Sequence, residues 1–107
     1  MNAWLLLFLA GVFEIVWAVG LKATSGFTRF WPSLGTVAAM IVSFFFLSQA
    51  LKTIPLGTAY AVWTGIGAVG TVVLGMIFFS EPREVARIVC LLLIICGIVG
   101  LKFISAR

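Results

Sequence analysis

The stretch AWLLLFLAGVFEIVWAVGL, residues 3–21, decides the fold. A membrane-spanning helix needs about 20 consecutive apolar residues, and this run reaches that length although it contains one acid, Glu14. Three similar runs follow, separated by short polar stretches. None of them alternates apolar with polar residues as membrane strands do. The sequence therefore predicts an all-α integral membrane protein, with one transmembrane domain over residues 1–107 and four helices at about 3–21, 32–51, 58–79 and 85–102.

The composition excludes most other classes of protein. Hydrophobic residues make up 64% of the chain and charged residues 9%, whereas a soluble domain carries about 25% charged residues. The chain has no His, which removes His-based triads and His metal sites. We find no nucleophile–base pair, metal cluster or phosphate loop. We therefore expect neither an enzyme nor a bound metal or cofactor. Cys90 and Cys96 lie in one helical run, point about 120° apart and cannot bridge each other.

The seven basic residues are scattered singly at or between the ends of the apolar runs, where membrane proteins keep Lys and Arg. This pattern argues against nucleic acid and for a lipid bilayer as partner, in a multi-pass protein of the inner (plasma) membrane. Their tally across the membrane is almost even, so it leaves open both a single orientation and insertion in both orientations. One side holds Lys22, Arg29, Arg83 and Arg87, and the other holds Lys52, Lys102 and Arg107.

Glu14 is the most informative residue because it lies near the middle of the first run. An ionised carboxylate at that depth costs about 3 kcal/mol or more, so it should face protein or a water-filled cavity. Its helical neighbours include the small residues Ala10, Gly11 and Ala18 and the aromatic Trp17. No basic residue lies deep in another run to pair with it. Glu14 is therefore expected to bind a proton or an external cation. The alternative is a neutral acid that only packs.

The other runs offer companions for Glu14. One face of the third helix holds Tyr60, Trp63, Thr64 and Gly67, and Ser43 lies near the middle of the second helix. A carboxylate, hydroxyls and aromatic rings together suit an organic cation. The simpler alternatives are lipid contact for the aromatic residues and a hydrogen bond from Ser43 to its own helix.

Two pairs of glycines suggest features of the helices. Gly65 and Gly67 in the third helix predict a kink or hinge, although close helix packing would explain them equally. Gly97 and Gly100 form a small-residue patch in the fourth helix, which suits a helix–helix interface such as a dimer seam.

Several motifs carry a resemblance to a known family. They include the position of Glu14, residues 21–22 and 25–29, Pro32-Ser33, and the run from Pro55 to Trp63. Over essentially its whole length the chain resembles the small multidrug resistance family of four-helix, proton-coupled exporters. Trp17-Ala18 and the run from Trp63 to Ala68 resemble the guanidinium-exporter subtype.

This resemblance implies an antiparallel homodimer with dual topology, in which Glu14 of both protomers binds either protons or the cation. It also implies that Trp17, Ser43, Tyr60 and Trp63 line the site. We therefore expect a proton-coupled antiporter that exports guanidinium and small guanidinylated cations. Guanidinium is planar, pairs with a carboxylate through two N–H groups and stacks on aromatic rings. The alternatives are an exporter of quaternary ammonium or other lipophilic cationic drugs, and a membrane component that transports nothing.

Overall fold

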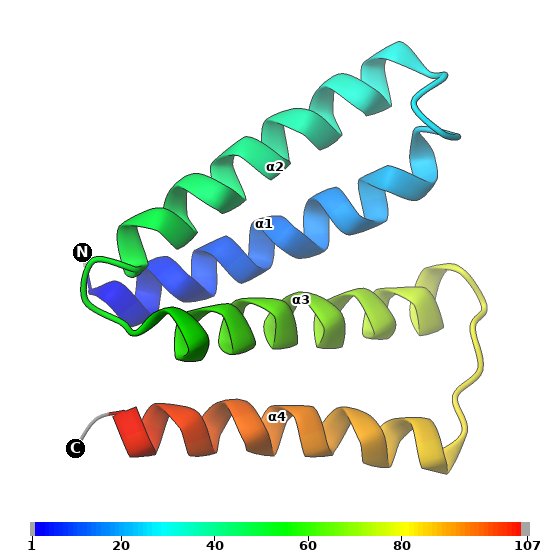
Figure 1. Ribbon diagram of the computed structural model, residues 1–107. Helices are drawn as coiled ribbons and strands as arrows, with labels where there is room; N and C mark the ends of the chain where they lie inside the picture. Colours follow the sequence, from blue (N-terminus) through cyan, green and yellow to red (C-terminus); the bar gives the residue numbers. More distant parts are fainter. Residues whose placement is uncertain (1, 106–107) are drawn as a thin grey trace.

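The computed structural model describes residues 2–105, which form four helices joined by short loops (Figure 1). All four are long and apolar enough to cross a membrane. This confirms the expected all-α membrane fold of four spanning helices. The helices are α1 (Ala3–Ala23), α2 (Phe30–Ala50), α3 (Leu56–Phe78) and α4 (Val85–Ser105).

The ends of the helices follow local chemistry. The side chain of Asn2 caps α1 by accepting the backbone N–H of Trp4 at 2.8 Å. Because α2 begins at Phe30, two residues before the expected start, Pro32 lies inside its first turn, where a missing N–H costs no helical hydrogen bond. Pro55 immediately precedes α3. These short connections place the loops after α1 and α3 at one end of the molecule and both termini at the other (Figure 1).

Helix α1 lies at the centre and packs along both α2 and α3 (Figure 1). Helices α2 and α3 meet over a short stretch near the loop that joins them, and they diverge toward the opposite end. Within residues 2–105, α4 packs mainly against α3 and is exposed along most of its length, with the Lys102 ammonium lying over the Trp4 ring of α1. Helices α2 and α3 therefore lie on either side of α1 and leave the molecule open at the end where they diverge.

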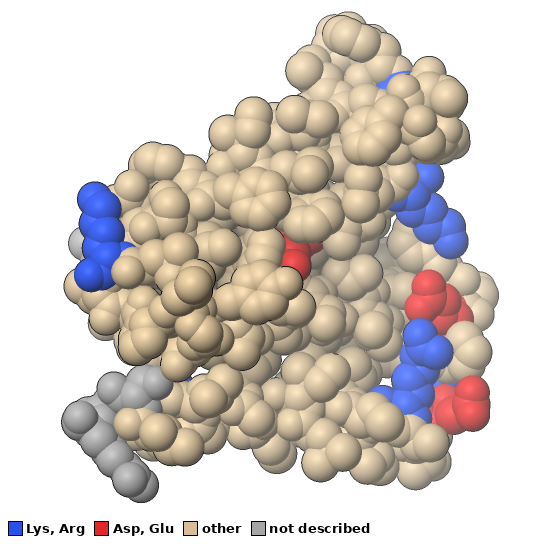
Figure 2. Space-filling model, viewed as in Figure 1, with Lys and Arg blue, Asp and Glu red and all other residues tan. Residues whose placement is uncertain are grey.

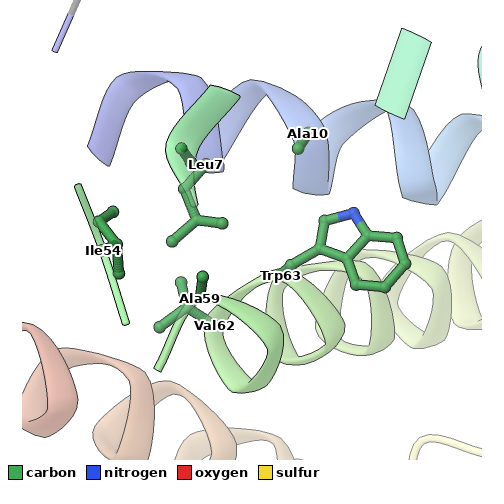
Figure 3. Close-up of a cluster of buried hydrophobic side chains, with 7 residues drawn as sticks. Leu7, Ala10, Ile54, Ala59, Val62 and Trp63 are labelled. Atoms are coloured by element: carbon green, nitrogen blue, oxygen red, sulfur yellow. The ribbon is translucent and has the colours of Figure 1, made fainter. Parts of the chain in front are cut away.

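The buried core occupies the closed end, where the joining loop brings α2 and α3 together over the first half of α1. Figure 3 shows side chains of α1, of α3 and of the loop between α2 and α3 converging, with the Trp63 indole reaching from α3 toward α1. The core fixes the relative positions of α1, α2 and α3 in the half of the molecule that holds the loop between α2 and α3. It consists of Leu7, Ala10, Ala50, Ile54, Ala59, Val62 and Trp63.

The loop between α3 and α4 is tied to the end of α3. Arg83 donates from Nε and Nη2 to the carbonyl of Met76, at 3.2 and 2.8 Å. Arg87 forms an ion pair with Glu81 at 3.2 Å. The last carbonyls of a helix lack partners within the helix, so a guanidinium there satisfies one of them and offsets the negative end of the helix dipole.

Candidate functional site

Glu14 lies in the middle of α1 and is half-buried between α1 and α3. A Cβ atom added at Gly67 of α3 would overlap Oε1 and Cδ of Glu14. The carboxylate therefore rests directly on the α3 backbone. Its Oε1 is buried and has no hydrogen-bond partner among residues 2–105. Figure 2 shows blue side chains at both ends of the molecule, red side chains at one of these ends, and one red group in the middle of the tan surface.

Ser43 joins the three helices that surround the acid. Its side chain is 0% exposed, and its hydroxyl donates to the backbone carbonyl of Ala10 in α1 at 2.6 Å. The same oxygen accepts the indole N–H of Trp63 in α3 at 3.0 Å. The structure thus brings Ser43 and Trp63 together, one helical turn from Glu14 along α1. In this arrangement the Ser43 proton is directed to Ala10 and not to the carboxylate.

A chain of aromatic rings runs along one side of Glu14. Trp17 packs against Phe44 with ring centroids 6.3 Å apart, and Phe44 packs against Trp63 at 5.5 Å. Tyr60 follows, with its ring 5.9 Å from that of Trp63. Tyr60 is 57% exposed, whereas Trp63 is 7% exposed and part of the core. The Nε1 of Trp17 is buried without a partner in the described part of the chain.

The glycines of α3 lie in close contact with neighbouring helices. Gly67 touches Glu14, and a Cβ atom at Gly65 would lie 2.8 Å from Cδ1 of Ile98 on α4. Close packing therefore accounts for both residues. Helix α3 runs unbroken from Leu56 to Phe78, and the hinge expected at these glycines remains a prediction.

Gly97 and Gly100 differ from these glycines. Within residues 2–105, a Cβ atom at either position would meet no other atom within 4 Å. Both residues lie on α4, outside the group formed by α1, α2 and α3. Their small size therefore serves no close contact among the described residues 2–105.

Sequence reasoning missed two residues near the acid. Phe44 joins the rings of Trp17 and Trp63, and its position next to Ser43 in the sequence was a usable signal. Thr71 has a buried hydroxyl without a partner among residues 2–105. It follows Gly67 by one helical turn, so the spacing that selected Tyr60, Trp63 and Gly67 also reaches Thr71.

The arrangement suits a small positively charged ligand. An unpartnered carboxylate oxygen in a membrane-spanning segment is expensive unless a proton or a cation joins it. The neighbouring rings offer π faces to a cation, and the absence of a side chain at Gly67 lets the carboxylate lie against the α3 backbone. Within residues 2–105, no three His, Cys, Asp or Glu side chains come together as metal ligands would.

Comparison with known proteins identifies the family of this chain. The model of the family described as Small Multidrug Resistance protein matches residues 2–94. The chain belongs to this family. With its four apolar helices, this member of the small multidrug resistance family is a multi-pass protein of the inner membrane.

Curated relatives match nearly the whole chain. The guanidinium exporter of Proteus vulgaris is 57% identical over 103 residues, which cover 96% of this chain and 99% of the relative. The guanidinium exporter of Citrobacter freundii is 56% identical over 100 residues, covering 94% and 95%. That of Yersinia pseudotuberculosis is 53% identical over 103 residues, covering 96% and 99%. The family expected from the motifs is thus confirmed.

Proposed function

We propose that this protein is a proton-coupled antiporter that exports guanidinium and small guanidinylated cations. The observation that carries the proposal is the Glu14 carboxylate, held in the middle of a membrane span with Oε1 buried and unpartnered. The three relatives named above, which are more than half identical to this chain, are guanidinium exporters, and this supports the choice of substrate.

Glu14 would bind either a proton or the cation, never both at once. A guanidinium ion presents paired N–H groups that match the two oxygens of a carboxylate, and its flat faces suit the nearby aromatic rings. A protonated carboxyl group has lost the charge that holds the cation. Exchange of one ligand for the other on opposite sides of the membrane would couple proton entry to cation export. The other candidate residues, Trp17, Ser43, Tyr60 and Trp63, would shape and orient this site.

The proposal includes an antiparallel homodimer of dual topology, with each chain contributing one four-helix transmembrane domain and one Glu14. Two observations support it. Helix α4 is exposed along most of its length and carries the open glycines Gly97 and Gly100. The basic residues are divided four against three between the two sides, which gives little instruction for a single orientation. The function proposed is transport, with no catalytic step.

The test uses the purified full-length protein in proteoliposomes on a solid-supported membrane. Guanidinium pulses should produce transport currents in the wild type and none in Glu14→Gln, which keeps the size of the side chain but not its charge. Equal monodispersity of the two proteins would show that folding is intact. Wild-type currents in Glu14→Gln would overturn the mechanism. A chain that transports nothing alone would instead be a silent membrane component.

A competition experiment separates the two possible substrate classes. Guanidinium and a tetra-alkyl ammonium ion would be added together, and the currents compared with those of each ion alone. The proposal expects guanidinium to be transported and to dominate. Currents from the tetra-alkyl ammonium ion and none from guanidinium would make the protein a drug exporter.

A further inference from the structure

The hydroxyl of Thr71 on α3 is a buried polar group that the proposed site does not explain. Its Oγ1 is buried and has no hydrogen-bond partner within residues 2–105. Inside a bilayer no water from the membrane core can satisfy such a group, so leaving it unpaired is costly. By contrast, the hydroxyls of Ser33, Ser43 and Ser48 on α2 each donate to a backbone carbonyl.

The position of Thr71 follows from that of Gly67. Residues four apart on a helix lie on the same face, with Cβ atoms about 5–6 Å apart. The Cβ position of Gly67 is filled by the carboxylate of Glu14, so Thr71 lies one helical turn from that carboxylate. Helical side chains lean toward the N-terminal end of their helix, which for Thr71 is the direction of Gly67. The hydroxyl is thus within reach of a small ion bound to Glu14.

Thr71 also completes a stripe along α3. Tyr60, Thr64, Gly67 and Thr71 follow one another at intervals of four, three and four residues and share one face of the helix. Glu14 lies against the glycine of this stripe, with hydroxyl-bearing residues on either side. Three buried polar atoms without partners belong to this part of the protein: Oε1 of Glu14, Nε1 of Trp17 and Oγ1 of Thr71.

The chemistry of these atoms selects a class of ligand. The carboxylate oxygen only accepts hydrogen bonds, the indole N–H only donates, and a threonine hydroxyl does both. Two acceptors one helical turn apart suit a cation with several N–H groups. A quaternary ammonium ion has no N–H group and would cover the hydroxyl with alkyl groups, leaving it unpaired.

We propose that Thr71 is a specificity-determining residue that accepts a hydrogen bond from a guanidinium ion held on Glu14, and so favours guanidinyl cations over quaternary ammonium ions. The inference rests on the proposed function and names a further contact within its site. The competing role is structural, with the hydroxyl turning back to the carbonyl of Gly67 four residues earlier, as helical threonines often do.

The experiment compares the wild type with Thr71→Val, which keeps the shape and removes the hydroxyl, and Thr71→Ser, which keeps the hydroxyl. Currents from proteoliposomes are recorded for guanidinium and for tetramethylammonium. Loss of one hydrogen bond should raise the KM for guanidinium about tenfold in Thr71→Val. The serine variant should stay within about twofold of the wild type, and tetramethylammonium currents should not fall. Thr28→Val is the matched control, because its hydroxyl lies in the loop after α1 and donates to the carbonyl of Ser25.

The outcomes separate the two proposals. A wild type without guanidinium currents overturns the proposed function and this inference with it. A wild type with such currents and an unchanged KM in Thr71→Val overturns the inference alone. An equal loss for both cations means a structural role and also overturns it. If Thr71→Val does not give monodisperse protein, Thr71→Ala provides the same comparison.

Discussion

The carboxylate of Glu14 on α1 occupies the space that a side chain at position 67 of α3 would fill. The two helices can place an acid against a helix backbone because Gly67 has no Cβ atom. This contact determines how far the carboxylate reaches toward α3. It also makes position 67 intolerant of any larger residue.

Gly67→Ala should therefore damage the site selectively. The new methyl group must displace the carboxylate, and such overpacking costs about 1–3 kcal/mol. We expect guanidinium currents to fall at least about tenfold, since 1.4 kcal/mol corresponds to that factor. The control is Gly35→Ala on α2, where a Cβ atom meets nothing within 4 Å among the described residues. That variant should keep full currents. Equal currents in both variants would contradict the contact.

Binding of guanidinium should weaken as the pH falls, because protons compete for Glu14. With one proton displaced per cation, the apparent Kd rises by up to about tenfold per pH unit on the acid side. The change in tryptophan fluorescence on adding guanidinium, measured at several pH values, would give this dependence. Glu14→Asp should shift the curve along the pH axis without flattening it. A Kd independent of pH would exclude competition at a single carboxylate.

Ser43→Ala should destabilise the helix arrangement. The substitution leaves the Ala10 carbonyl and the Trp63 indole N–H without the partner they have now. Each buried group left unpaired costs about 1–3 kcal/mol. We expect a lower midpoint of thermal unfolding and a changed dependence of guanidinium binding on pH. Ser48→Ala is the control, since Ser48 is exposed and its hydroxyl donates to the Phe45 carbonyl of its own helix. If both variants unfold at the same temperature, the hydrogen bonds of Ser43 contribute little.

Gly97→Leu should disrupt self-association without disturbing the protomer. There is open space around Gly97 within residues 2–105, so a larger side chain meets no clash inside one chain. If α4 forms the seam of the proposed dimer, size-exclusion chromatography with light scattering should show a shift toward monomer. Gly35→Leu places the same side chain at an equally open position on α2 and should leave the dimer intact. A dimer that survives Gly97→Leu would assign the seam to another helix.

Arg83→Ala should lower thermal stability and leave transport unchanged. Arg83 is exposed and donates two hydrogen bonds to the last turn of α3, far from Glu14 along the membrane normal. Loss of this contact should cost about 1 kcal/mol. Unfolding monitored by circular dichroism in detergent would measure the effect, with Lys52→Ala as a control that removes an exposed charge at the other end. A marked rise in the KM for guanidinium would show that the loop acts on the site.

The fold class and the importance of one acid can both be predicted from the amino-acid sequence. The length and hydropathy of a spanning helix are local properties, so four apolar runs predict four helices without any knowledge of their contacts. The depth of Glu14 follows from its place in the first run, and the cost of a charge at that depth predicts a function. The motifs from Leu21 to Trp63 then indicated the family, which the family model and the relatives confirmed.

The residues that surround Glu14 could not be predicted in this way, because they depend on how the helices pack together. Lipid is as apolar as the helix surfaces, so hydropathy does not specify which faces of the four helices meet. Contacts between small residues and buried hydrogen bonds make that choice. Gly67 lies under the carboxylate, Ser43 is held between Ala10 and Trp63, and Gly65 meets α4. Sequence reasoning missed Phe44 and Thr71 for the same reason. Their positions beside the site depend on how α2 and α3 pack against α1.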